Sequence, residues 1–483
     1  MNPLGSMAAP MIATATTAIA VMLVIGAYRS HRMTVFVTAI GLLTALLLVL
    51  TAWRLPDRAV PPLLILDHYA LFYHALFLLV ALSLTLLGYG YLQHHETQRE
   101  EYYLLLLLAT LGSMTLVAST HFASFFLGLE MLSISLYALI AFRAGRAPGV
   151  EAAIKYLVLA GLTSSFLLFG MALVYSQLGT MTLADLAAAL SQPLTPVLVG
   201  GLLLIFVGIG FKLAVVPFHL WTPDVYEGAP APVSAFIATV SKGAVLALLL
   251  RYTTMLNLSA DQTLGQAIAW GAILSMTVGN LLALKQPDLK RLLAYSSIAQ
   301  MGYLLIAVLL SGPVGASVAT FYLVTYFAAT LAAFGIITAL ASDREEPSLL
   351  AEYRGLAWRR PWLAGLLTMA LLSLAGLPLT AGFLGKFVLV TAGVGAHLWA
   401  LVIVLIVNST ISLYYYLRAA SILYARTDEG AEASTAAGHG TPAALVAAAT
   451  AVTLVALALI ILWLGVYPSP LLATIGEVAT SFR

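Results

Sequence analysis

The sequence predicts an all-α integral membrane protein. Of its 483 residues, 61% are hydrophobic and only 9% are charged, whereas a soluble domain has about 25% charged residues. Apolar windows of about 20 residues, the length that a helix needs to cross the hydrocarbon core, recur along the whole chain. The strands of a membrane β-barrel would be about half as long and would alternate polar and apolar residues, so only helices fit.

About fourteen of these windows follow one another along the chain. They cover residues 8–27, 34–53, 68–92, 102–119, 122–142, 152–176, 195–216, 230–250, 264–284, 292–311, 314–341, 361–392, 397–424 and 441–466. The first window is as long as a full span and has no basic region before it, unlike a cleaved signal peptide. We therefore expect it to be the first transmembrane helix.

The Lys and Arg residues are unequally divided between the two sides of the predicted bundle. Loops after odd-numbered windows hold fourteen of the 22, and the opposite side holds Arg54, Arg58, Arg251 and Arg483. Loops rich in Lys and Arg face the cytoplasm, which predicts both termini on the outer side. One odd-side loop, 217–229, departs from this bias, because it has no Lys or Arg and carries Asp224 and Glu227.

Composition excludes several functions. A net charge of +2 offers no basic face for nucleic acid. With no cysteine, the chain can provide neither a disulfide nor a thiolate-bound zinc ion or iron–sulfur cluster. Any redox chemistry would belong to another polypeptide. The polar stretch 427–440 is expected to be a flexible cytoplasmic loop.

Two windows contain helix breakers beside a lysine. The seventh includes GFKLAVVPFHLWTP, with Lys212 and Pro217, and the twelfth includes LAGLPLTAGFLGKF, with Gly376, Pro378 and Lys386. In transporters, broken helices at corresponding places in two halves indicate an internal repeat and an ion path. We expect the seventh and twelfth helices to be discontinuous.

Charged residues inside the windows are the strongest functional candidates, because a charge at the bilayer centre costs about 2.5–3.5 kcal/mol. Glu130, Lys242 and Lys386 lie near the middle of their windows, and Lys212 lies where the apolar run continues through the break. The alternative for these four residues is a purely structural ion pair.

Two further residues have equally plain alternatives. Lys155 lies only four residues into its window, where a lysine can extend to the interface. His219, next to the break at Pro217, fits either a helix-end histidine bound to backbone carbonyls or a proton relay.

Four motifs together resemble a known family. FFLGLEMLSISLYALIAFR, FKLAVVPFHLWTPDVYEGAPAPVSAFIATVSK, LKRLLAYSSIAQMGYLL and GLPLTAGFLGKF are similar to the proton-translocating membrane subunits of respiratory complex I, which are related to Mrp-type cation/proton antiporter subunits. The resemblance covers at least residues 100–425. Within it, the LGLEMLS form around Glu130 and the lysine at 386 resemble the N-type subunits. M-type subunits have a glutamate at the position of Lys386, and L-type subunits continue into a long lateral helix that is not expected here.

This resemblance implies an architecture. Helices 4–8 and 9–13 would form two inverted five-helix repeats, with helices 7 and 12 broken. The implied regions are 1–100 with the first three helices, 101–255 with the first repeat, 260–425 with the second repeat, and 426–483 with the cytoplasmic loop and helix 14.

The resemblance also implies a proton relay. Glu130 and Lys212 would be an ion pair, in direct or one-water contact, in a half-channel toward the inner side. Lys242 would be the central relay, and Lys386 the gate of a second half-channel toward the outer side. Three residues would be accessory: Lys155, His219 and Lys290.

The implied function is a proton-translocating membrane subunit of NADH:quinone oxidoreductase in the bacterial inner membrane. Electron transfer from NADH to quinone would take place in partner subunits that hold the flavin and iron–sulfur clusters, with no cofactor in this chain. Partners would be peripheral subunits, a neighbouring antiporter-like subunit, small membrane subunits and lipid, and no nucleic acid. The alternatives are a subunit of an Mrp-type cation/proton antiporter, which would need clustered oxygen ligands for a dehydrated cation, and an inert scaffold, which does not explain the buried lysines.

Overall fold

The computed structural model describes residues 7–95, 98–143, 146–190, 195–256, 262–310, 312–341, 346–426 and 444–480. Within these ranges, thirteen helices are long and apolar enough to cross a membrane, and two shorter apolar helices in the twelfth window provide one further crossing. The predicted all-α membrane fold is confirmed. The predicted loop 427–440 lies outside the described residues.

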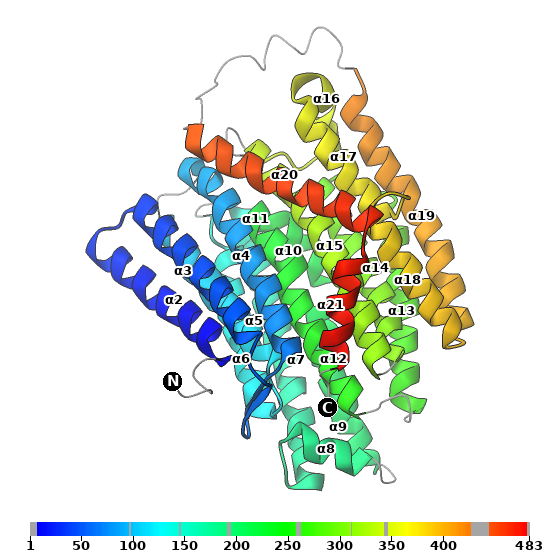
Figure 1. The fold of residues 1–483 in the computed structure, drawn as a ribbon. Coiled ribbons are helices and arrows are strands. Elements are labelled where there is room, and N and C mark those ends of the chain that lie inside the picture. Colours follow the sequence, from blue (N-terminus) through cyan, green and yellow to red (C-terminus); the bar gives the residue numbers. More distant parts are fainter. Residues whose placement is uncertain are drawn as a thin grey trace.

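The N-terminal part consists of α2 (Ala9–Ala27), α3 (His31–Ala52) and α4 (His68–His95), coloured blue in Figure 1. Between α3 and α4, the strands β1 (Arg58–Val60) and β2 (Leu64–Leu66) form an antiparallel hairpin. The sequence did not predict this hairpin, because three-residue strands are too short to leave a periodic pattern.

Helices 4–8 of the predicted first repeat contain one break and one π-helical segment. The elements are α5 (Glu100–Val117), α6 (Phe122–Ile140), α7 (Ala147–Leu178), α8 (Leu183–Leu190), α9 (Pro196–Leu213), α10 (Trp221–Gly228), α11 (Ala231–Phe236), the π-helix η1 (Ile237–Ser241) and α12 (Lys242–Leu256). Helix 7 is thus α9 followed by the short α10, and helix 8 is the continuous run of α11, η1 and α12.

Helices 9–13 of the predicted second repeat are followed by two C-terminal helices. The elements are α13 (Gln262–Ala283), α14 (Leu289–Leu309), α15 (Gly312–Ala341), the 3-10 helix η3 (Leu350–Tyr353), α16 (Leu356–Arg359), α17 (Pro361–Ala375), α18 (Ala381–Gly395), α19 (Trp399–Tyr424), α20 (Ala444–Val466) and α21 (Ser469–Thr480). Helix 12 is the pair α17 and α18. The last predicted membrane window ends at residue 466, but a further helix, α21, follows it and buries Ile475, Val478 and Ala479.

The opening helix pairs of the two predicted repeats cross in the same way. A Cβ atom on Gly112 of α5 would lie 2.7 Å from the backbone nitrogen of Leu132 on α6. In the second repeat, a Cβ atom on Gly302 of α14 would lie 2.8 Å from the backbone nitrogen of Met276 on α13. Small residues at a crossing let two membrane helices approach closely, so both pairs depend on glycine.

Helix 8 lies at the centre of the molecule and α2 at its edge (Figure 1). The whole apolar window of helix 8 is buried inside the chain, against 28% of the window of α2. The N-terminal end of α2 and the C-terminal end of α21 lie at the same end of the bundle, together with the hairpin and α8. Helix α20 crosses the bundle obliquely in contact with α4, α15 and α18. Charged residues on helix 8 are therefore shielded from lipid by other helices.

Candidate functional site

The predicted break in helix 7 is confirmed, and its freed backbone groups find partners inside the protein. α9 ends at Leu213, and Ala214 has a φ of 59°. The indole Nε1 of Trp221 donates to the carbonyl of Phe211 at 2.9 Å, and the backbone N–H of Val216 donates to Ser275 Oγ at 2.9 Å. Irregular backbone is tolerated at membrane depth where the protein satisfies it in this way.

The predicted break in helix 12 is also confirmed and brings Lys386 to the broken end. α17 ends at Ala375, and Gly376 follows with a φ of 85°. Lys386 Nζ donates to the carbonyl of Ala375 at 2.8 Å, and a Cβ atom on Gly376 would lie 2.8 Å from Lys386 Cδ. Both the backbone conformation and the lysine contact therefore require glycine at 376.

Lys212 lies in the last turn of α9 and is 3% exposed. Its Nζ donates to Ser133 Oγ of α6 at 2.6 Å and to the hydroxyl of Tyr156 of α7 at 3.2 Å. The ring of Tyr156 lies against that of Trp221, tilted by 47° with centroids 4.8 Å apart. An aromatic cluster thus packs beside Lys212.

Glu130 does not make the predicted contact in its direct form. Both residues are described, and no ion pair joins Glu130 to Lys212 within 4.0 Å. The carboxylate instead accepts a hydrogen bond of 2.7 Å from Ser164 on α7. Ser133, which binds Lys212, lies three residues after Glu130 on the same side of α6. The sequence could not show that a serine would take the place nearest the lysine.

Lys242 is fully buried at the first residue of α12. Its Nζ donates to Ser297 Oγ of α14 at 2.7 Å, and it lies 5.4 Å from the ring centroid of Tyr226. The same serine oxygen is 2.7 Å from the hydroxyl of Tyr326 on α15 and 3.2 Å from that of Tyr226. Lys242 therefore reaches the second repeat through a hydroxyl cluster.

Lys386 also ends among hydroxyl and carbonyl groups. Besides the carbonyl of Ala375, its Nζ donates to Ser409 Oγ of α19 at 2.9 Å. It lines a small cavity with Gln300, Tyr322 and Tyr326. At 7% exposure, Lys386 faces the interior and not lipid.

Lys155 belongs to a charge network at the protein surface. Its Nζ is 2.8 Å from Asp224 and 2.7 Å from Glu151, and its side chain is 44% exposed. Arg291 of α14 binds Asp224 at 2.9 Å and Glu227 at 2.5 Å. These contacts explain why loop 217–229 carries acids on a side rich in basic residues: cations of α7 and α14 neutralise them.

Lys290 forms a buried ion pair that the sequence did not reveal. Its Nζ donates to the carboxylate of Glu346 and, at 2.6 Å, to the carbonyl of Ala229. Glu346 also accepts a hydrogen bond from the hydroxyl of Tyr91 at 2.8 Å. Burial is the largest effect and opposes ionisation of Glu346, but the charge and hydrogen bond of Lys290, together with the hydrogen bond of Tyr91, hold the pKa of Glu346 below its usual value. The pair joins α4, α14 and the connection between helices 7 and 8.

A second buried ion pair lies at the opposite end of helix 8. The guanidinium of Arg251 binds both carboxylate oxygens of Asp67, at 2.7 and 2.9 Å, and its Nε donates to the carbonyl of Val117 at 2.9 Å. Both side chains are 1% exposed. Burial raises the pKa of Asp67, but Arg251 outweighs this effect and lowers it. An aspartate before an apolar window predicts a helix N-cap, yet nothing in the sequence identifies its distant partner.

The contacts of His219 fit both a helix-end histidine and a proton relay. It is 8% exposed and forms a hydrogen bond with the backbone at Pro217, as a helix-end histidine would. No partner for its Nδ1 is found among the described residues, so a water molecule or a transferred proton has a site there.

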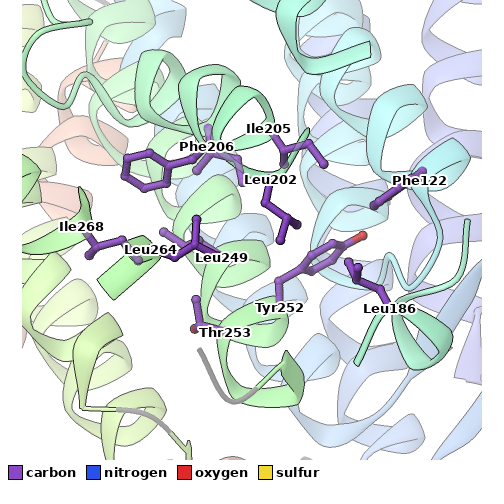
Figure 2. A pocket seen from close by; sticks show the side chains of 11 residues that line it. Phe122, Leu186, Leu202, Ile205, Phe206, Leu249, Tyr252, Thr253, Leu264 and Ile268 are labelled. Atoms are coloured by element: carbon purple, nitrogen blue, oxygen red, sulfur yellow. The ribbon is translucent and has the colours of Figure 1, made fainter. Parts of the chain in front are cut away.

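The apolar pocket in Figure 2 lies outside this arrangement. It is lined by residues of α6, α8, α9, α12 and α13, and among these its polar side chains are Tyr252 and Thr253. None of the buried lysines lines it. No group of three or more potential metal ligands occurs in the described ranges.

Comparisons with known proteins match this chain to membrane subunits of NADH:quinone oxidoreductases and Mrp antiporters. The family model described as NADH:quinone oxidoreductase/Mrp antiporter, TM matches residues 119–412. NADH-quinone oxidoreductase subunit N of Methylococcus capsulatus is 46% identical over 97% of this chain and 94% of that protein. A chain of respiratory complex I from Thermus thermophilus has a TM-score of 0.79 at 35% identity, covering 96% of this chain and 98% of that one. A chain of the Mrp complex from Dietzia sp. has a TM-score of 0.87 at 24% identity, covering 99% and 97%.

Proposed function

This chain belongs to the subunit N family of the NADH:quinone oxidoreductase membrane subunits, and we propose that it conducts protons through Glu130, Lys212, Lys242 and Lys386. It is a proton-translocating subunit of complex I, and its partners are other subunits of that complex. The Mrp antiporter is a more distant relative, at 24% identity against 46% for the subunit N relative.

One observation carries the proposal: three lysines are buried within membrane-spanning helices, and each binds hydroxyl or carbonyl groups. Lys212, Lys242 and Lys386 are between 0% and 7% exposed, and none forms an ion pair with a described carboxylate. By contrast, Arg251 and Lys290 are bound to Asp67 and Glu346. A structural cation keeps its proton beside a carboxylate, whereas a desolvated lysine among neutral groups is suited to reversible proton transfer.

The first half of the path consists of Glu130 and Lys212. Ser133 binds Lys212, and Ser164 binds Glu130, so a single water molecule bridging Glu130 and Lys212 would complete the predicted contact. We assign the aromatic cluster of Tyr156 and Trp221, which packs beside Lys212, as the barrier between this pair and Lys242. In this proposal, a proton loaded on the inner side waits at Lys212 until the cluster opens.

The second half of the path ends at Lys386, which we assign as the gate toward the outer side. Its position after the break in helix 12 supports this assignment, because α18 continues from the break toward the end of the bundle that holds both termini. The bias of Lys and Arg toward the other loops supports placing those termini on the periplasmic side of a bacterial inner membrane. Lys155 and Lys290 are accessory as cations that hold the structure around helices 7 and 8 through their carboxylate partners. His219 is accessory through its Nδ1 at the break, which has no partner among the described residues.

We also propose how the chain is divided into repeats and which subunits it contacts. Residues 101–255 and 260–425 form the two inverted repeats, which the two breaks and the two glycine crossings support. Residues 1–100 and 426–483 flank them. A neighbouring antiporter-like subunit and small membrane subunits contact the exposed apolar helices, and flavin and iron–sulfur clusters belong to other subunits of the complex.

Lys242→Met in the assembled complex tests the relay. The substitution leaves an apolar helix that inserts at least as easily as the parent, so the complex should assemble while NADH-driven proton uptake into inverted membrane vesicles falls. Lys285→Met, which removes an exposed lysine of a loop, is the control and should pump normally. Full, well-coupled pumping by an assembled Lys242→Met complex would refute the central role of Lys242.

A further inference from the structure

A line of hydroxyl groups leads from Lys242 toward Lys386. Lys242 Nζ is 2.7 Å from Ser297 Oγ, and Ser297 Oγ is 2.7 Å from the hydroxyl of Tyr326. Tyr326 and Lys386 line the same small cavity. Ser297 and Tyr326 are 1% and 4% exposed, so neither bulk water nor lipid reaches this line from the side.

We propose that Ser297 and Tyr326 are catalytic residues of proton translocation, which carry the proton from Lys242 to the cavity of Lys386. The inference rests on the proposed lysine relay and adds the groups that connect its two halves. In the described part of the chain, Ser297 is the one hydrogen-bond partner of Lys242 Nζ. A proton that leaves Lys242 must therefore pass to this serine.

The valence of the serine oxygen limits the onward transfer to one of two tyrosines. A hydroxyl oxygen has one hydrogen to donate and two lone pairs to accept, and Ser297 Oγ has three partners: Lys242, Tyr226 and Tyr326. Because Lys242 donates to it, one tyrosine must donate as well and the other must accept. We assign Tyr326 as the acceptor of the serine hydrogen, because Tyr326, unlike Tyr226, lines the cavity of Lys386.

Each bond that breaks in the transfer is matched by one that forms. Both hydroxyl groups are neutral before and after it. The N–H bond of the Lys242 ammonium breaks as an O–H bond forms on Ser297, and the former serine hydrogen moves to Tyr326. The tyrosine releases its own hydrogen toward a water molecule in the cavity, and that water protonates Lys386. Each hydroxyl gains one hydrogen and loses one, and the net change is one proton moved from Lys242 to Lys386.

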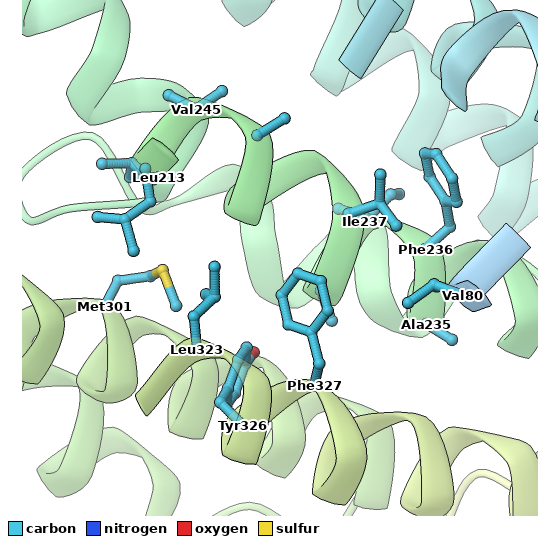
Figure 3. Close-up of a cluster of buried hydrophobic side chains, with 14 of the residues drawn as sticks. Val80, Leu213, Ala235, Phe236, Ile237, Val245, Met301, Leu323, Tyr326 and Phe327 are labelled. Atoms are coloured by element: carbon cyan, nitrogen blue, oxygen red, sulfur yellow. The ribbon is translucent and has the colours of Figure 1, made fainter. Parts of the chain in front are cut away.

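The packing around this line keeps its members in place. A Cβ atom on Gly243, the residue after Lys242, would collide with the ring of Phe327 on α15. Figure 3 shows Tyr326 between Leu323 and Phe327, on the side of α15 that faces helix 8. The glycine lets α15 approach helix 8 at the residue next to the relay lysine, so the hydroxyl of Tyr326 comes within reach of Ser297.

Tyr326→Phe in the whole complex tests the proposal, because it removes the hydroxyl and keeps the ring. NADH-driven proton uptake by vesicles should slow at least about ten-fold, since a positioned proton carrier typically contributes 10²-fold or more. In D₂O, the variant should show a larger solvent isotope effect than the parent, because proton transfer across the gap becomes rate-limiting. A merely structural loss would leave the isotope effect unchanged.

The chain provides a matched control for this substitution. Tyr73 is also fully buried, and its hydroxyl lies 2.8 Å from Thr320 Oγ1 on the same helix α15. Tyr73→Phe deletes an equivalent tyrosine hydroxyl away from Lys242 and should retain the proton uptake of the parent. Ser297→Ala tests the first contact if Tyr326→Phe fails to assemble, with Ser296→Ala, which breaks a neighbouring contact to Tyr416, as its control.

The outcomes separate this inference from the relay on which it rests. If Lys242→Met and Tyr326→Phe are both defective while Tyr73→Phe is normal, the hydroxyl line is supported. If Lys242→Met is defective but Tyr326→Phe and Ser297→Ala pump normally, the lysine relay stands and the hydroxyl line is overturned. Normal pumping by all three variants would overturn both.

Discussion

The buried pair of Asp67 and Arg251 allows a quantitative test of stability. Asp67→Asn keeps the shape of the side chain and removes its charge, which leaves the Arg251 guanidinium in a site with 1% exposure. Removing one partner of a buried ion pair costs about 3–5 kcal/mol, because the remaining charge is desolvated without compensation. One of the two hydrogen bonds, at 2.7 and 2.9 Å, would also be lost, because the amide nitrogen of Asn donates and cannot accept from the guanidinium.

The assembled complex is heated in mild detergent and then run on native electrophoresis. The measured quantity is the temperature at which this subunit dissociates from the complex. Asp67→Asn should lower that temperature clearly, and the double variant Asp67→Leu with Arg251→Met should recover much of the loss, since an apolar replacement of a buried pair is often neutral or stabilising. Glu101→Gln is the control. It breaks a surface ion pair, in which the side chain of Arg29 is 55% exposed and that of Glu101 is 31% exposed. Such pairs contribute about 0–1 kcal/mol to stability. Two results would refute this reasoning: dissociation of Asp67→Asn at the temperature of the parent, or dissociation of the double variant at a lower temperature than Asp67→Asn.

Two further predictions concern the second repeat. Lys386→Arg should assemble but block proton release, because arginine, with a pKa above about 12, keeps its proton; proton uptake by vesicles equal to that of the parent would contradict the gate assignment. The second prediction concerns Glu346, whose pKa Lys290 holds low. At a pH above the usual carboxyl pKa, the ion pair contributes its full stabilisation, and this stabilisation is lost as the pH falls through the lowered pKa of Glu346. Glu346→Gln should therefore dissociate at a lower temperature than the parent at pH 7, and the difference should shrink in acid; a difference independent of pH would argue against the pair.

The sequence predicted the elements of this fold better than their contacts. Spans could be placed because each one is a contiguous apolar run, and the breaks in helices 7 and 12 could be placed because proline and glycine act locally. Lys212, Lys242 and Lys386 were identified for the same reason, since a charge in an apolar run is visible without a structure. The hairpin at residues 58–66 and the helix α21 leave weaker local signals and were missed.

The polar partners could not be predicted, because packing brings them together over long separations. Asp67 and Arg251 are 184 residues apart, and Lys290 and Glu346 are 56 apart. Ser297 is one of many serines in apolar helices, where a hydroxyl normally binds its own backbone, and only the crossing of helix 8 with α14 shows that it binds Lys242. The same limit applies to Glu130 and Lys212, for which direct or one-water contact was expected: the sequence could not show that Ser133 binds Lys212 and Ser164 binds Glu130.

The π-helical segment before Lys242 controls the helical phase of everything that follows it. Residues Ile237–Ser241 form one wide turn within an otherwise α-helical span, and such a turn accommodates an extra residue. Since one residue corresponds to about 100° of rotation in an α-helix, the wide turn determines which neighbour Lys242 faces. Moving the wide turn past Lys242 would swing its ammonium group away from Ser297 while both ends of helix 8 stay in place. The position of this wide turn therefore decides whether Lys242 faces Ser297, independently of where the ends of helix 8 lie.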